Sequence, residues 1–151
     1  MKNPMPTYND KHRFAFGEST DTAQAQVLGE SCLVQGRLYD ALDFFRSAND
    51  SKAIDSIVES CVESGDIFLV KYALDTKGVQ LSPQLADKIG DKALAQGKIT
   101  FAKQAFAAAG SKEKLERIAD GERQAREALL QQDQAENNTG NTEQDQVQGH
   151  L

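Results

Sequence analysis

Histidine and cysteine, two residue types that often support catalysis or metal binding, are scarce in this chain. The sequence of 151 residues holds two His and two Cys. His12 and His150 stand in the two polar terminal segments, so a His-based triad or metal site needs one of them ordered beside other suitable groups. No such constellation emerges from the spacing of the residues. We therefore predict a protein that is not an enzyme, with no cofactor and no bound metal.

The two cysteines, Cys32 and Cys61, occupy equivalent places in two helical segments. A disulfide requires Cα atoms about 5.5 Å apart, whereas the axes of packed helices lie about 8–10 Å apart. We expect both side chains to be small buried packing residues, with a redox pair as the alternative.

Composition narrows the range of partners. The net charge is −6, from 17 basic and 23 acidic residues, and the basic residues form no run. An acidic chain of this kind is a poor candidate for binding nucleic acid or an anionic membrane. There is no run of about 18 apolar residues and no apolar signal core near Met1. We expect a cytoplasmic protein that contacts neither nucleic acid nor membrane.

Apolar residues recur with helical spacing along most of the chain, and glycines interrupt the pattern at regular intervals. Gly36, Gly65 and Gly97 each stand between two helical segments, as in a helical hairpin. The pairs Asn49-Asp50 and Gly110-Ser111 can each end one helix in the left-handed conformation and cap the next. The predicted hairpins cover about residues 21–48, 51–78 and 82–109, and a last helix begins near residue 111.

The two ends of the chain are more polar than its middle. We predict an irregular N-terminal arm over residues 1–19, with Tyr8, Phe14 and Phe16 as apolar side chains that could dock on the first hairpin. From residue 132 the chain is rich in Gln, Asn, Glu and Asp. Such a segment buries too little apolar surface to offset its ordering entropy, so we predict a disordered polar tail over residues 132–151.

The hairpins are similar to one another in sequence. A shift of 61 residues aligns residues 29–57 with residues 90–118, and a shift of 29 residues aligns Glu30-Ser31-Cys32 with Glu59-Ser60-Cys61. Self-similarity at a period near 30 is typical of a helical solenoid. The 61-residue shift pairs eight identical residues: Gly29, Leu33, Gln35, Gly36, Ala41, Phe45, Ala48 and Ile57 with Gly90, Leu94, Gln96, Gly97, Ala102, Phe106, Ala109 and Ile118.

These residues resemble the tetratricopeptide repeat (TPR), which combines small residues at helix-packing positions with an aromatic residue on the second helix. The resemblance covers about residues 21–130. It implies an all-α fold, a right-handed α-α superhelix of three hairpins with a C-terminal capping helix, over residues 20–131. The residues that fit are Gly29, Ala41, Phe45 and Ala48 in the first unit, and Gly90, Ala102, Phe106 and Ala109 in the third.

Several features depart from the TPR pattern. The units are spaced by 29 and 32 residues, whereas the family repeat is about 34 residues long, and the usual Pro at the unit end is absent. The second unit has Val58 and Val70 at small-residue positions and Lys77 at the last one. The shorter units also look like the helical hairpins of vesicle-coat solenoids, which are the alternative.

In the TPR family the first helix of each hairpin lines a concave groove that binds peptides. The resemblance therefore implies a partner-binding groove with six acidic side chains, which would attract a partner segment rich in Lys or Arg. A solvated acidic face without a partner is the alternative. The implied groove residues are Gln26, Glu30, Leu33, Val34, Asp55, Glu59, Val62, Glu63, Asp87, Asp91 and Leu94.

Two functions from different classes follow. The favoured hypothesis is an adaptor or chaperone-like module that binds a segment of another protein, a basic one being the preferred class. The alternative is a structural assembly subunit that stacks through the ends or the convex face of the solenoid, so self-association stays open. The identity of the partner is not encoded in these patterns.

Overall fold

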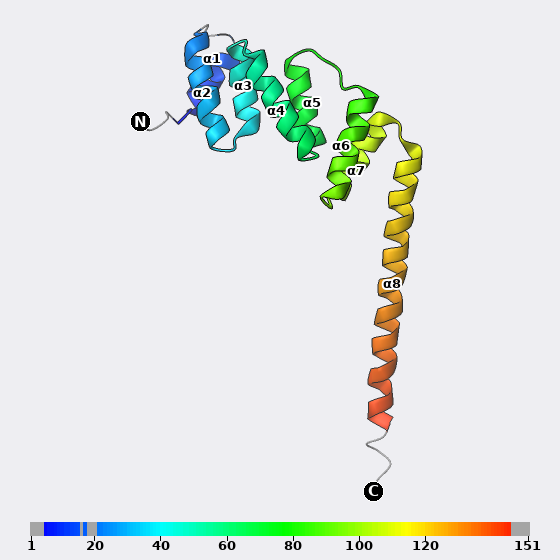
Figure 1. Ribbon diagram of the computed structural model, residues 1–151. Helices are drawn as coiled ribbons and strands as arrows, with labels where there is room; N and C mark the ends of the chain where they lie inside the picture. Colours follow the sequence, from blue (N-terminus) through cyan, green and yellow to red (C-terminus); the bar gives the residue numbers. More distant parts are fainter. Residues whose placement is uncertain (1–4, 16, 18–20, 146–151) are drawn as a thin grey trace. The chain divides into compact units, whose positions relative to one another are not determined.

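The computed structural model describes residues 5–15, 17 and 21–145, and the regular structure in these ranges is all α-helical. The described part divides into two units, the first ending at Ser111 and the second beginning at Lys112. Within the first unit, neighbouring helices pack as sequential pairs in chain order (Figure 1). The eight helices of the described part are α1 (Tyr8–Ala15), α2 (Thr22–Val34), α3 (Leu38–Ser47), α4 (Ser51–Glu63), α5 (Ile67–Thr76), α6 (Pro83–Ala95), α7 (Ile99–Ala109) and α8 (Lys112–Asp145).

Local sequence signals explain where these helices begin and end. The side chain of Asp50 accepts a hydrogen bond from the amide of Ala53 at 3.0 Å, which caps α4. Asp21, Asp66 and Ser82 cap α2, α5 and α6 in the same way. Between α3 and α4, Asn49 has a positive φ of 56°, in the left-handed region that ends helices. The hairpin boundaries predicted from the sequence are thus confirmed to within one or two residues.

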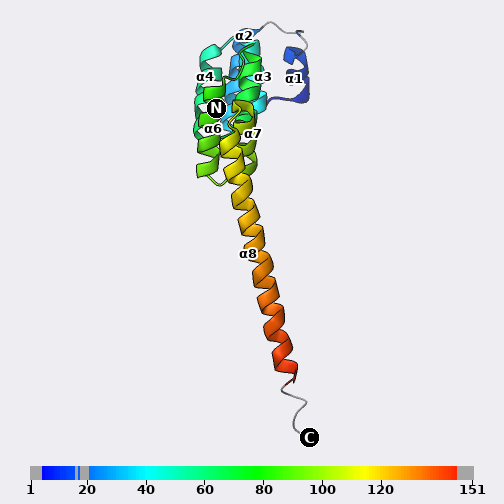
Figure 2. The same ribbon diagram turned by 90° about the vertical axis from the view of Figure 1, so that its right-hand side faces the viewer.

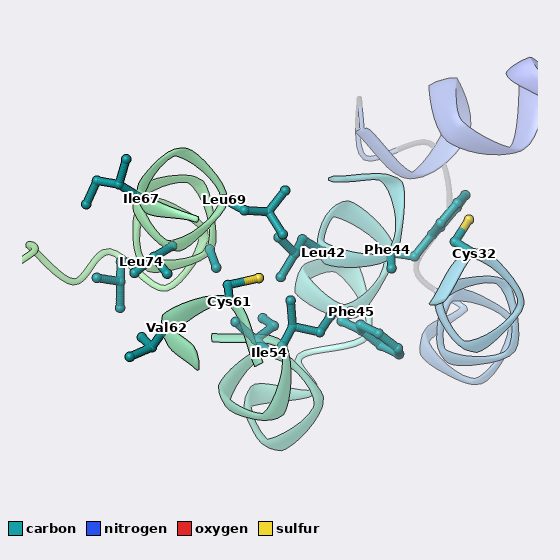
Figure 3. Packing of buried hydrophobic residues seen from close by; sticks show 14 of the residues in the cluster. Cys32, Leu42, Phe44, Phe45, Ile54, Cys61, Val62, Ile67, Leu69 and Leu74 are labelled. Atoms are coloured by element: carbon teal, nitrogen blue, oxygen red, sulfur yellow. The ribbon is translucent and has the colours of Figure 1, made fainter. Parts of the chain in front are cut away.

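The core of the first unit forms between the helices of each pair and between neighbouring pairs. Leu42 of α3 and Leu69 of α5 lie toward each other, and the ring of Phe45 points from α3 toward α2 (Figure 3). Leu42 and Phe45 are at most 1% exposed, and the cluster continues through α4 to Ile89 of α6. Burial of these side chains is the main force that stacks the pairs.

Glycine allows close helix contact in the first and third pairs. A Cβ atom at Gly29 would lie 2.7 Å from Cε1 of Phe45, and one at Gly90 would lie 2.4 Å from Cε1 of Phe106. The aligned position in the second pair is Val58. Consistent with this larger side chain, α4 and α5 contact each other less extensively than α2 and α3 or α6 and α7 do.

The N-terminal segment differs from the irregular arm that the sequence predicts. Residues 8–15 form α1, which packs against α3 (Figure 2). Phe14 is 7% exposed and its ring meets that of Phe44 edge-on at 5.7 Å, while Lys11 pairs with Asp40. Phe14 therefore docks as proposed, Tyr8 is 82% exposed, and Phe16 lies outside the described residues.

The C-terminal segment also differs from the prediction. Helix α8 continues through residues 132–145, where the sequence predicts disorder, and residues 146–151 lie outside the described part. Gln, Glu and Ala, which make up most of residues 131–136, are good helix formers, so this exposed part of the helix can persist without a buried face. The capping role expected of this helix remains a prediction. Within the described residues, no helix combines the length and the apolar character needed to cross a membrane.

Candidate functional site

The residues of the implied groove come from α2, α4 and α6, which we call the A helices. We call the eleven predicted residues together the A-helix face, and nine of them are exposed side chains. Asp87 is half-buried, and Val62 is 6% exposed. The structure thus places most of the predicted set in contact with solvent, while Val62 contributes to the floor of the surface.

A hollow of about 450 Å³ lies between α4 and α6, and we call it the α4–α6 hollow. Three of the predicted residues line it, namely Glu59, Val62 and Glu63. Three further lining residues, Val58, Leu85 and Lys88, were missed by the sequence analysis. Val58 lies one turn before Val62, and Leu85 and Lys88 are spaced i, i+3 on α6, so helical spacing from the predicted residues could have found them.

A smaller hollow of about 210 Å³ lies on the other side of α4. Leu33 of α2 and Ile57 of α4 provide its apolar wall, and Ser56 and Ser60 add hydroxyl groups. Leu33 is 41% exposed, and its aligned counterpart Leu94 on α6 is 40% exposed. The two leucines therefore offer similar amounts of accessible apolar surface on the first and last A helices.

Some predicted groove residues instead hold their own hairpin together. Asp87 accepts a hydrogen bond from the hydroxyl of Ser111 at 2.6 Å, at the junction that follows α7. The aligned pair in the first hairpin is Gln26 and Asp50, whose side chains lie 3.5 Å apart, at the long limit for a hydrogen bond. In the second hairpin, Asp55 pairs with Lys77 at the end of α5.

The rim of the α4–α6 hollow carries charges of both signs. Lys92 of α6 pairs with Glu63 of α4 at 2.6 Å, and this hydrogen bond lowers the pKa of the Glu63 carboxyl below its ordinary value. The side-chain amide of Gln96 donates to the backbone carbonyl of Glu63 at 2.8 Å. With Lys88 beside Glu59 on the lining, the hollow is less acidic than the sequence alone suggests.

The two cysteines lie in the core of the first unit. Cys32 and Cys61 are free buried thiols, and desolvation raises the pKa of Cys61 to about 11. A thiol with such a raised pKa is a poor nucleophile near neutral pH. Among the residues that the structure describes, no three His, Cys, Asp or Glu side chains are grouped to hold a metal ion.

No protein-family model matches this chain, and neither a curated protein nor a solved structure matches it. The described residues form an all-α fold whose neighbouring helices pack as stacked pairs.

Proposed function

We propose that this protein is a non-enzymatic, TPR-like helical-repeat module that binds a segment of another protein along its A-helix face. The repeat is supported by matching contacts at aligned positions: Gly29 with Phe45 and Gly90 with Phe106, and two fully buried alanines, Ala41 and Ala102. Matching contacts are what stacked copies of one unit produce.

The observation that carries the binding proposal is the α4–α6 hollow. Its apolar residues, Val58, Val62 and Leu85, can receive one large apolar side chain of a partner, and burying such a side chain contributes about 1.5–3 kcal/mol. An exposed ion pair with Glu59 adds about 0.2–1 kcal/mol. The apolar anchor therefore dominates the affinity, and the carboxylates favour a Lys or Arg beside it.

A peptide titration tests this proposal. The probes are two synthetic peptides with the same central Leu, one flanked by Lys and the other by Glu. We expect the Lys-flanked peptide to bind more tightly. The double charge reversal Glu59→Lys/Asp91→Lys should weaken its binding about 5- to 30-fold, the equivalent of about 1–2 kcal/mol.

The matched control is Asp75→Lys/Glu116→Lys, which changes the net charge by the same amount on α5 and α8, outside the A helices. This control should bind the Lys-flanked peptide as tightly as the wild type does. Any long-range electrostatic effect of the added charge should disappear on addition of salt. Equal binding of the peptide to both double variants would show that the A-helix face is not the site.

An exposed apolar residue on the first A helix favours the alternative function, a subunit that assembles by stacking. Because α1 packs on α3, the outer side of α2 keeps Val27 48% exposed at that end of the stack. Light scattering of the full chain, and of a chain lacking residues 1–18, tests stacking through this end. A stable monomer in both cases would remove it.

A further inference from the structure

Four aromatic side chains form a continuous row across the second helices of the pairs, α3, α5 and α7. Tyr39 of α3 meets Tyr72 of α5 edge-on at 5.0 Å, and Phe68 of α5 meets Phe101 of α7 edge-on at 5.1 Å. Phe68 and Tyr72 are four residues apart on α5, so they lie on one face of that helix. We call these four residues the aromatic row.

Two side chains of the aromatic row are far more exposed than the aromatic residues of the core. Tyr39 is 47% exposed and Phe68 is 42% exposed, whereas Phe44 and Phe45 on α3 are at most 1% exposed. Exposed aromatic residues arranged in one patch are typical of protein interfaces, in which they are enriched.

An exposed positive charge accompanies the aromatic row. Lys71 is exposed on α5, three residues after Phe68 and next to Tyr72. Lys98, three residues before Phe101, donates to the backbone carbonyl of Ser64. Near Tyr39 the two aspartates of α3 are already engaged. Lys11 pairs with both of them, Arg37 pairs with Asp40 at 2.5 Å, and the hydroxyl of Tyr72 donates to Asp43 at 2.5 Å. Asp75 is the exposed acid that remains on α5.

Helix α8 carries a complementary stripe. Leu129 is 62% exposed and Leu130 is 52% exposed, the largest apolar side chains in the second half of this helix. Glu127 and Asp133 lie three residues before and after Leu130, on its face of the helix. After Arg126 the sequence contains no further Lys or Arg. We call Glu127, Leu129, Leu130 and Asp133 the acidic leucine stripe. Its charge is opposite to that of Lys71 beside the aromatic row.

We propose that two copies of this chain associate, each laying the acidic leucine stripe of its α8 on the aromatic row of the other. In such a two-fold arrangement the same contact forms twice. The stripe of the first copy meets the row of the second, and the stripe of the second copy meets the row of the first. Forming the contact twice matters because a specific interface must bury about 1,000 Å² or more, and two copies of the contact bury twice the area of one. The surface lies on α3, α5 and α7, so the proposal is independent of peptide binding by the A helices.

Light scattering and sedimentation of the full chain over a concentration series test the association. The wild type should form a dimer that dissociates on dilution and on addition of salt. The variants Leu129→Gln/Leu130→Gln and Tyr39→Gln/Phe68→Gln should each shift the equilibrium toward monomer by at least about tenfold, because both remove exposed interface residues. The control Val79→Ser removes an exposed apolar residue elsewhere and should leave the dimer intact.

A charge exchange and a crosslink make the pairing specific. Lys71→Glu alone and Glu127→Lys/Asp133→Lys alone should weaken the dimer, and the combined variant should recover it. In a mixture of light and heavy-isotope chains, a carbodiimide should join the Lys71 amine to a Glu127 or Asp133 carboxyl as an amide, with loss of water, between chains. Any one of three results would overturn the proposal. These are a wild type that stays monomeric at every concentration, crosslinks found only within single chains, and a dimer that neither glutamine variant weakens. Circular dichroism of each variant verifies its helix content.

Discussion

Substitution of Gly90 by Ala tests whether close helix contact in the third pair outweighs helix propensity. In an exposed helix interior, Ala is more favourable than Gly by about 1 kcal/mol. At Gly90, however, the new Cβ would lie 2.4 Å from Cε1 and 2.6 Å from Cδ1 of Phe106. The ring cannot move aside, because Phe106 is fully buried. Overpacking of this kind costs about 1–3 kcal/mol, so we expect a net loss of about 1 kcal/mol in the free energy of unfolding.

Gly121→Ala is the matched control for this substitution. Gly121 lies within α8, and a Cβ added there meets nothing within 4 Å. Here the propensity gain stands alone, so helix content measured by circular dichroism should stay equal or rise. The two Gly→Ala changes should therefore act in opposite directions, the first destabilising and the second neutral or favourable, although a scale of helix propensity assigns both the same effect.

The second pair suggests a rescue. At the positions aligned with Gly90 and Phe106 it has Val58 and Leu74. Adding Phe106→Leu to Gly90→Ala should make room for the new methyl group, so that the double variant loses about 1–2 kcal/mol less than the sum of the two single losses. Urea unfolding followed by circular dichroism measures all four proteins. Strict additivity, or a Gly90→Ala variant more stable than wild type, would contradict this account of the close contact.

Three further outcomes follow from particular contacts. Asp50→Ala removes the N-cap of α4 and should cost about 1 kcal/mol in urea unfolding, whereas Asp50→Ser should cost less than half of that. Cys61, with its pKa raised from 9.0 to about 11, should hold about 100-fold less thiolate than an ordinary thiol near neutral pH, so labelling by a thiol reagent should follow unfolding rather than precede it. Burial raises the pKa of Asp40, but hydrogen bonds from Lys11 and Arg37 outweigh burial and bring it below the ordinary value. A lowered pKa adds stability above the unfolded-state pKa of about 3.9, so this contribution should fade as the pH falls below about 4, and Asp40→Asn should flatten that part of the pH–stability profile.

The predicted and observed hairpins agree because their signals are local. A capping aspartate such as Asp50 and a left-handed residue such as Asn49 act on the next few amides, so their positions fix helix ends wherever the helix packs. The two terminal segments were predicted less well. Residues 8–15 form a helix that is held on α3 by Phe14, a contact about 30 residues away along the chain, which local pattern does not reveal.

The candidate groove remains a prediction. The TPR resemblance implies Glu59 and Glu63 as groove residues, and both line the α4–α6 hollow. The sequence could not show that Lys88 and Lys92 come from α6 to the same rim, because this depends on how two neighbouring pairs pack. It also could not separate Asp87, which is bonded to Ser111, from acids that face solvent.

The sequence by itself determined the helices, their pairing and the similarity between the first and third pairs, since caps, turn glycines and apolar spacing act over one or two helical turns. Tertiary structure decided which side chains are left for a partner. Charges on neighbouring helices neutralise some of the acids, hairpin contacts engage others, and the aromatic row becomes continuous once α3, α5 and α7 lie side by side. Availability of a side chain is a property of its neighbours in space, and those neighbours are brought together by packing rather than by local sequence.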